Sequence, residues 1–384
     1  MAGKPASGPA SALSGGSGSG GGGSLLRWVK GQLSWLAYQG VGLVVSLPLA
    51  LKLLLQFITN PRKTLHRKDR SQIKYPDPLP GLTHEWIETE PDVKLHAVRT
   101  SKGSGKPLML FVHGFPEFWF SWRHQMEHFR KDYEVVAIDM RGYGESSKPK
   151  GRDAYRMNHL AGDVNAVAEH LLKESGQKQL VLVGHDWGAN LCWAAAYLAP
   201  RLYRRLAILA VPHPRCYLAN MDWDQFRRSW YVFAFQVPFL AEAALCANDY
   251  QQVADAFVGK PVGPDHPERY FTPEDIERYK QNFGRPGMAH ASVNFYRAMI
   301  DTNTRAPFYE LRQAQRGNLS VPTLILWAEK DAALGPQARS ALLRGTEKYV
   351  DRVKVVVMPG CSHWIQHEQP EETNRLLREF METS

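Results

Sequence analysis

Short apolar runs alternate with amphipathic segments along most of the chain. The runs are rich in β-branched residues, and they predict strands at 84–90, 93–100, 107–112, 134–140, 179–183, 206–211, 323–327 and 353–358. Apolar positions recur with a helical period in several of the intervals, most clearly at 157–173, 189–198 and 369–381. Strands that alternate with helices predict an α/β fold, in which helices cover both faces of a mostly parallel sheet.

The strand pattern fades between Pro212 and Asn318, where aromatic residues are frequent and the sequence favours helices. An insertion of this length between two strands is expected to lie above the carboxyl edge of the sheet, where open α/β folds bind their ligands. We therefore predict a helical lid at 212–318. The lid would separate a first part of the core at 75–211 from a second part at 319–384.

The N-terminal region has a different pattern. Residues 1–30 are rich in Gly and Ser and predict a disordered segment. The following stretch, 31–58, is apolar and carries one charge, Lys52, and about 20 apolar residues suffice to cross a bilayer. The stretch predicts a membrane anchor, either a single transmembrane span or a helix in the membrane interface. A cleaved signal peptide fits less well, because the run is long and starts late.

The positive charge of the chain lies next to this anchor. The formal net charge is +9, but residues 1–60 hold four basic and no acidic residues, and 61–70 hold five basic residues and one acidic residue. The folded body is therefore nearly neutral, and the charge does not indicate a nucleic-acid partner. The basic cluster at 62–70, within a juxtamembrane linker at 59–74, suits anionic lipid headgroups. By the positive-inside rule it places the C-terminal side in the cytoplasm. The four cysteines are far apart and predict neither a disulfide framework nor a Cys-rich zinc site.

A candidate nucleophile follows the predicted strand at 179–183. The sequence at 184–188 reads Gly-His-Asp-Trp-Gly, and a helix is predicted directly after it. This is the pattern of a nucleophile elbow with Asp186 at its centre, where flanking glycines leave room for a strained turn. The alternative is that Asp186 only caps the helix.

Three further loops follow predicted strands. The loop after 107–112 reads His-Gly-Phe-Pro, and in this architecture it supplies an oxyanion-hole N–H, here that of Phe115, with the N–H of Trp187 as the second donor. Asp331 and His363 follow the last two strands, in the chain order nucleophile, acid, histidine. Glu329 competes with Asp331 for the acid role. The weaker candidates for the base, none of which follows the last strand as directly, are His113, His185, His213 and His367.

From about residue 75 to its end, the chain resembles the α/β-hydrolase fold and, within it, the membrane-anchored, mammalian-type epoxide hydrolases. The matching residues are 113–117, 141–146 (Arg-Gly-Tyr-Gly-Glu-Ser), 184–188, Asp331 and His363. The resemblance implies that two lid tyrosines, Tyr231 and Tyr296, hydrogen-bond the epoxide oxygen; otherwise they are aromatic core residues. It also implies a substrate site lined by these tyrosines with Phe115, Pro116 and Trp187, no metal or organic cofactor, a small-molecule epoxide as partner, and an endoplasmic reticulum membrane location.

The implied reaction is chemically consistent with an aspartate at position 186. The carboxylate is ionised at neutral pH, and its attack on an epoxide leaves an ester, which water activated by His363 and Asp331 hydrolyses to a vicinal diol. A serine would leave an ether instead. The aromatic lid and the anchor favour apolar, lipid-like epoxides. Two alternatives stay open, a haloalkane dehalogenase-like hydrolase and a non-catalytic lipid-binding protein on the same fold.

Overall fold

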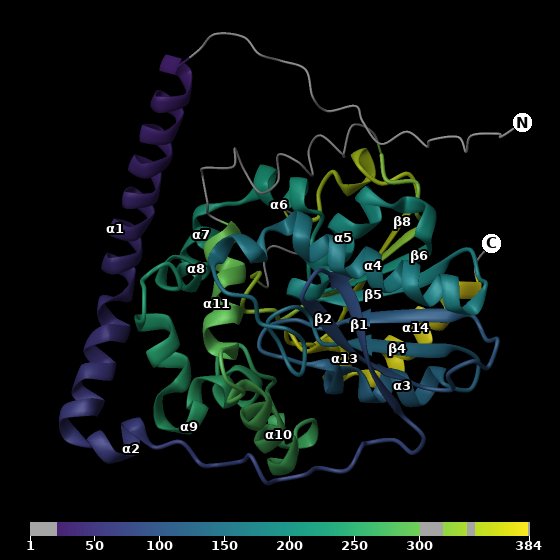
Figure 1. Ribbon diagram of the computed structural model, residues 1–384, viewed down its shortest axis with the longest axis horizontal. Helices are drawn as coiled ribbons and strands as arrows, with labels where there is room; N and C mark the ends of the chain where they lie inside the picture. Colours follow the sequence, from purple (N-terminus) through teal and green to yellow (C-terminus); the bar gives the residue numbers. More distant parts are fainter. Residues whose placement is uncertain (1–20, 300–317, 336–341, 383–384) are drawn as a thin grey trace, which may run out of the picture.

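The computed structural model describes residues 21–299, 318–335 and 342–382 (Figure 1). Its eight-stranded sheet has the order β1-β2-β4-β3-β5-β6-β7-β8. The strands are β1 (Thr83–Glu90), β2 (Val93–Arg99), β3 (Leu108–Val112), β4 (Glu134–Ile138), β5 (Leu180–His185), β6 (Tyr203–Leu209), β7 (Thr323–Ala328) and β8 (Val353–Met358). Strand β2 is antiparallel to both of its neighbours, and every other neighbouring pair is parallel. The predicted fold class and the predicted strands are confirmed, with boundaries that differ by a few residues.

Helices cover both faces of this sheet. α4 (Met157–Ser175) and α5 (Trp187–Leu198) lie on one face, and α3 (Arg123–Phe129) and α14 (Pro370–Glu382) lie on the other (Figure 1). Every residue of the central strands β3, β4 and β5 is consequently buried. Because β3, β5, β6, β7 and β8 are parallel, the loops that follow them emerge at one edge of the sheet, as predicted for the candidate site.

The segment between β6 and β7 is helical where the structure describes it. It contains α6 (Pro214–Asn220), α7 (Trp223–Arg228), α8 (Trp230–Ala234), α9 (Leu240–Val258), α10 (Pro273–Phe283) and α11 (Met288–Met299). α9 is interrupted at 247–250, where Asn248, Asp249 and Tyr250 have positive φ angles. The end of the predicted lid, 300–317, lies outside the described residues. The insertion covers the carboxyl edge of the sheet, so it is positioned to close over the loops there.

The N-terminal apolar stretch forms one long helix, α1 (Gly21–Thr59), followed by α2 (Pro61–Leu65). The helix begins at Gly21, so the prediction of disorder for 1–30 is wrong for 21–30, where Leu25, Leu26 and Val29 lie among the first turns. Residues 1–20 lie outside the described part. The first half of α1 extends away from the body, and its second half runs beside the lid (Figure 1). Gly40–Thr59 is long and apolar enough to cross a membrane.

The basic linker after α2 is tied to the lid. The Arg70 guanidinium is 4% exposed and lies 2.6 Å from the Asp249 carboxylate of α9 and 3.1 Å from Glu277 of α10. Lys68 pairs with Glu277 as well. Hydrogen bonds from Arg70 help lower the pKa of Asp249 to about 2, although burial opposes this shift. The buried Arg70 is therefore neutralised within the protein, so the expectation that the whole cluster contacts lipid headgroups is wrong for Arg70, whereas the Lys68 side chain stays 51% exposed.

Candidate active site

Asp186 occupies a strained turn between β5 and α5. Its backbone has φ 50° and ψ −120°, a conformation that costs a non-glycine residue on the order of 1–3 kcal/mol. The turn is possible because glycines surround it. A Cβ atom on Gly188 would lie 2.2 Å from the Val112 carbonyl oxygen, and one on Gly114 would lie 2.5 Å from the Asp186 Cβ. The elbow predicted from the sequence is thus packed against the loop after β3.

This close packing predicts a loss of stability when Gly188 is replaced by alanine. The added methyl group would overlap backbone atoms, which cannot turn away as a side chain can, so we expect the free energy of unfolding to fall by about 1–3 kcal/mol. Gly162→Ala is the matched control, because Gly162 lies inside α4 with nothing within 4 Å of its added Cβ. Alanine should raise stability there by up to about 1 kcal/mol. Urea denaturation of both variants measures the difference, and equal stabilities would contradict the packing argument.

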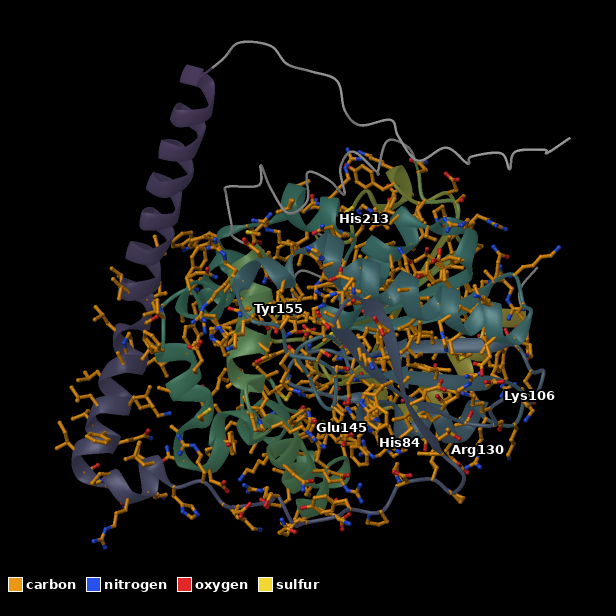
Figure 2. The ribbon with its side chains drawn as sticks, in the orientation of Figure 1. His84, Lys106, Arg130, Glu145, Tyr155 and His213 are labelled. Atoms are coloured by element: carbon orange, nitrogen blue, oxygen red, sulfur yellow. The ribbon has the colours of Figure 1, made fainter. Side chains whose placement is uncertain are left out.

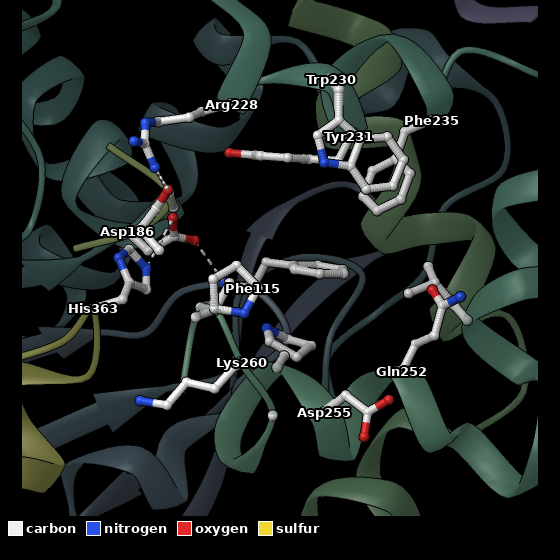
Figure 3. Close-up of a pocket in the computed structure, with 18 of the residues that line it drawn as sticks. Phe115, Asp186, Arg228, Trp230, Tyr231, Phe235, Gln252, Asp255, Lys260 and His363 are labelled. Atoms are coloured by element: carbon white, nitrogen blue, oxygen red, sulfur yellow. Dashed lines mark hydrogen bonds and ion pairs between the residues drawn. The ribbon is translucent and has the colours of Figure 1, made fainter. Parts of the chain in front are cut away.

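The two carboxylate oxygens of Asp186 have different surroundings (Figure 3). The Phe115 N–H donates to Oδ1 at 2.9 Å, while Oδ2 lies 3.6 Å from Nε2 of His363. The contact with Phe115 confirms that the loop after β3 and the elbow meet as predicted. Burial raises the pKa of Asp186, but the hydrogen bond and charge of His363 outweigh it, so this pKa lies below its ordinary value. The carboxylate is therefore ionised at neutral pH, with Oδ2 facing the imidazole.

His363 is held from behind by Asp331. The Nδ1 atom of His363 lies 2.7 Å from Oδ2 of Asp331, and Oδ1 of Asp331 accepts hydrogen bonds from the Ala333 and Leu334 N–H groups. The rival acid, Glu329, instead accepts a hydrogen bond from the Gly360 N–H. Burial lowers the pKa of His363, but the charges of Asp331 and Asp186 outweigh it and raise this pKa well above its ordinary value. The geometry therefore places Asp331, not Glu329, beside the imidazole.

Both tyrosines named from the sequence line the same cavity as Asp186. The cavity has a volume of about 460 Å³, and most of its wall is apolar. The rings of Tyr231 and Tyr296 lie 5.9 Å apart, and Trp187 packs edge-on against Tyr296 at 5.0 Å. Figure 3 shows Tyr231 above the pocket on the side opposite Phe115. Burial raises the pKa of both phenols, and the negative charge of Asp186 adds to this, so both stay protonated as donors.

The other histidines have structural surroundings. His113 is fully buried, with Nδ1 at 2.8 Å from the Gly114 carbonyl and Nε2 accepting from the Met140 N–H. His213 caps the amino end of α6 by accepting from the Arg215 N–H (Figure 2). Neither is in the wall of the cavity. These contacts agree with their lower rank as base candidates.

A buried network beneath the site was missed by the sequence analysis. Glu117 is fully buried and accepts hydrogen bonds from the Gly114 N–H, from His185 and from the Gln366 amide, and it also lies 3.2 Å from His367. His185 in turn lies 2.9 Å from the carbonyl oxygen of His363. The network joins the loop after β3, the elbow and the loop after β8. Its sequence signal was an acidic residue close to the Gly-Phe-Pro turn, with a histidine beside the nucleophile.

The cavity wall also contains residues that no motif indicated. They come from α1, α7, α8, α9 and the loops after α9 and after β7: Leu49, Arg228, Trp230, Leu245, Gln252, Asp255, Ala256, Lys260, Val262, Ala332 and Ala333. Within the described ranges, no three His, Cys, Asp or Glu side chains are placed to hold a metal ion together. A smaller cavity of about 110 Å³ shares Asp186 and both tyrosines with the larger one, and its further lining includes Asn190, Pro214, Tyr217 and Met299.

Comparison with known proteins agrees with the fold and the site. The family described as alpha/beta hydrolase fold matches residues 107–370. The chain is 33% identical over 365 residues to epoxide hydrolase 4 of Mus musculus. The aligned region covers 93% of this chain and 96% of the mouse protein. It is 34% identical over 336 residues to epoxide hydrolase 1 of Caenorhabditis elegans. That alignment covers 86% of this chain and 77% of the Caenorhabditis elegans protein.

Solved structures give the same result. An epoxide hydrolase of Bacillus megaterium in complex with an inhibitor is 28% identical, with a TM-score of 0.64, covering 78% of this chain and 100% of that one. A mutant of an epoxide hydrolase from Bacillus megaterium, complexed with a naphthyloxy-propanediol as its product, has a TM-score of 0.65 at 28% identity and the same coverage. With a complete elbow, acid and histidine in the corresponding fold, the chain belongs to the epoxide hydrolase family of α/β-hydrolases.

Proposed function

We propose that the protein hydrolyses apolar epoxides to vicinal diols through a covalent ester on Asp186. The observation that carries the proposal is the position of Asp186. Its Oδ1 accepts a hydrogen bond from the Phe115 N–H, and its Oδ2 lies beside His363. Asp331 lies on the far side of the His363 imidazole. Two protonated lid tyrosines face the same cavity. This set supplies a nucleophile, donors for an oxygen leaving group and a base for the second step.

In the first step, Oδ2 of Asp186 attacks an epoxide carbon, and the bond from that carbon to the ring oxygen breaks. Tyr231 and Tyr296 stabilise the developing alkoxide, and one of them transfers its proton to it. The products are a hydroxyalkyl ester on Asp186 and a tyrosinate. Oδ1 stays with the Phe115 N–H throughout, because it becomes the carbonyl oxygen of the ester.

In the second step, His363 takes a proton from water, and the resulting hydroxide attacks Cγ of Asp186. The Phe115 N–H, with the Trp187 N–H, stabilises the tetrahedral oxyanion, and such a donor is worth about 3 kcal/mol. When the ester forms, the proton that His363 holds in the free enzyme passes through solvent to the tyrosinate. Collapse of the tetrahedral intermediate then releases the diol and regenerates the carboxylate, and His363 keeps the proton taken from water, as in the free enzyme. Ester formation also removes the charge of Asp186, which lowers the pKa of His363 at the step that needs a neutral imidazole.

The substrate class follows from the cavity and the anchor. A volume of about 460 Å³ with a mostly apolar wall suits a medium-sized hydrophobic molecule, and Gln252, Asp255 and Lys260 form a polar part of the wall. We propose lipid-like epoxides, and we propose that α1 holds the protein at a membrane. The endoplasmic reticulum location and the cytoplasmic catalytic domain stay predictions.

A screen for diol release tests this function. The purified full-length protein, in mild detergent, is incubated with alkyl, aryl and fatty-acid epoxides and with matched haloalkanes. Release of vicinal diol from the epoxides alone supports the proposal. Halide release would instead indicate a dehalogenase, and binding without turnover would indicate a lipid-binding protein.

Loss of one phenol should slow only the first chemical step. We expect Tyr296→Phe to lower the rate of ester formation about 10²-fold, since the donor to the leaving oxygen is lost while ring packing is retained. Tyr231→Phe should have a similar effect, and the double variant a larger one. Tyr279→Phe is the control, since this buried tyrosine lies on α10 outside the cavity wall. Single-turnover kinetics provide the measurement, and unchanged ester formation in both variants would remove the tyrosines from the mechanism.

A further inference from the structure

One stripe of α1 is packed against the lid. The less exposed positions of its second half recur at helical spacing, as on one helix face: Gly42, Val45, Ser46, Leu49, Ala50, Leu53 and Gln56. A Cβ on Gly42 would lie 2.6 Å from the Phe233 carbonyl oxygen of α8, so the two helices are in close contact. Further along, the Asn248 amide of α9 donates to the Gln56 side chain at 3.2 Å.

This packing conflicts with a conventional transmembrane span. The apolar window Gly40–Thr59 is the part that lies along the lid, and a bilayer needs about 20 residues to be crossed. A window that ends before Gly42 would instead contain Arg27 and Lys30, which are costly at bilayer depth. A span through Gly40–Thr59 would carry α8, which packs on Gly42, and the part of α9 at Asn248 toward the hydrocarbon.

The outer side of α1 is nevertheless strongly apolar. Its exposed residues there are Val41, Leu43, Val44, Leu47, Leu51, Leu54, Leu55, Phe57 and Ile58. The side chains of this part of α1 point away from the body (Figure 2). A surface of this size is rare on a soluble monomer and marks contact with a partner or a membrane.

The lid continues this surface. Trp223 is 74% exposed and stacks on Phe226, which contacts Phe233 at 5.1 Å, and Phe233 is the residue packed on Gly42. Phe239 is 85% exposed and lies in the α8–α9 connection, two residues after Val237. The Cγ2 atom of Val237 would lie 3.3 Å from a Cβ on Gly42, so this connection is also close to α1. Aromatic side chains are favoured at the level of lipid headgroups. Lys52 in the last part of α1 and Arg62 and Lys63 of α2 are also exposed, and they suit anionic headgroups.

The active-site cavity reaches this same surface. Leu49 of α1 and Trp230 of the lid are both part of its wall, and Trp230 is 45% exposed. Trp230 therefore connects the wall of the cavity with the exposed aromatic surface of the lid beside α1. Asp186 lies in the wall of the same cavity.

We propose that α1 and the aromatic lid residues Trp223, Trp230 and Phe239 enter one leaflet together, so that the protein is monotopic and epoxides reach Asp186 laterally from the lipid. The route to Asp186 rests on the proposed epoxide hydrolysis, whereas the monotopic arrangement does not. The occupant of the surface is a lipid leaflet, and both termini of the chain lie on the same side of the membrane.

A topology measurement tests the arrangement independently of catalysis. The full chain carries a different epitope tag at each end, and intact microsomes are treated with protease with and without detergent. We expect both tags to share one fate in intact vesicles. Protection of one tag and digestion of the other would show a single span and overturn the proposal.

A kinetic measurement tests the lateral route. The double variant Trp223→Gln/Phe239→Gln should lower kcat/KM at least about tenfold for a long-chain epoxide held in phosphatidylcholine–phosphatidylserine vesicles, because apolar contact with the leaflet is lost. It should leave kcat/KM for a short, water-soluble epoxide within twofold of the parent protein. Trp86→Gln, at a 50% exposed tryptophan on edge strand β1, is the control and should affect neither.

Equal losses for both epoxides, or no loss for either, would overturn the lateral route. If the parent protein hydrolyses neither epoxide, the proposed function itself fails. Depth-dependent quenching of tryptophan fluorescence by brominated lipids then decides the membrane contact, since the quenching must be smaller in the double variant, which lacks Trp223.

Discussion

Replacing Asp186 by alanine should lower diol release from an apolar epoxide by at least about 10⁴-fold, because the covalent nucleophile is removed. No other described carboxylate occupies its place, because Asp331 accepts hydrogen bonds from the Ala333 and Leu334 N–H groups and faces Nδ1 of His363 from behind. Removing the carboxylate should not unfold the protein, since alanine keeps the same backbone turn and adds no new buried group. Mass spectrometry and product analysis measure turnover, and circular dichroism checks the fold.

The control separates loss of the nucleophile from loss of any charge in the cavity. Asp255→Ala removes another carboxylate from the same wall, and we expect it to lower diol release far less.

A single turnover of the parent protein in ¹⁸O-water gives a second test. The first diol should be unlabelled, because its new oxygen comes from Asp186, and the label should appear in the side chain. Labelled diol in that turnover would mean direct attack by water.

The parts of the site that the sequence predicted are those that depend on local order along the chain. The elbow residue Asp186 directly follows a strand, and Asp331 and His363 lie a few residues after theirs. Parallel strands bring their carboxyl ends to one edge of the sheet, independently of the sequence of the segments that connect them. Phe115 was identified for the same reason. Their mutual distances were not predictable, but their shared edge was.

The parts that the sequence did not predict depend on pairing between distant segments. Nothing near Arg70 indicates that its partners are Asp249 and Glu277, because no periodicity connects a linker to a lid. The same holds for Glu117, whose hydrogen bonds reach His185 and Gln366 in two other loops. The hydropathy of the sequence predicted a helix at α1, but the helix is apolar on all of its faces. Which face packs against the lid, the stripe through Gly42, was therefore visible only in the structure.

Replacing His363 by glutamine should leave the first step largely intact and stop the second. Glutamine keeps a polar side chain near Oδ2 of Asp186 but cannot accept a proton from water, so the hydroxyalkyl ester should accumulate to nearly one equivalent per protein. Steady-state diol release should fall by about 10³-fold or more. Intact-protein and peptide mass spectrometry should find the epoxide mass on Asp186. Absence of an adduct, with the substrate still consumed, would remove His363 from the role of base.

The pH dependence of the parent protein gives the same role a second, independent readout. In the free enzyme, the carboxylates of Asp331 and Asp186 keep the pKa of His363 raised, although burial opposes them. Once the ester forms, Asp186 is neutral and the pKa of His363 falls, so the rate of ester hydrolysis should rise with pH and then level off as the imidazole loses its proton. Ester formation should instead stay nearly constant over this range, since the pKa of Asp186 is lowered and those of the phenols are raised. In His363→Gln the rising limb must vanish, and its persistence between about pH 5 and 9 would assign the proton transfer to another group.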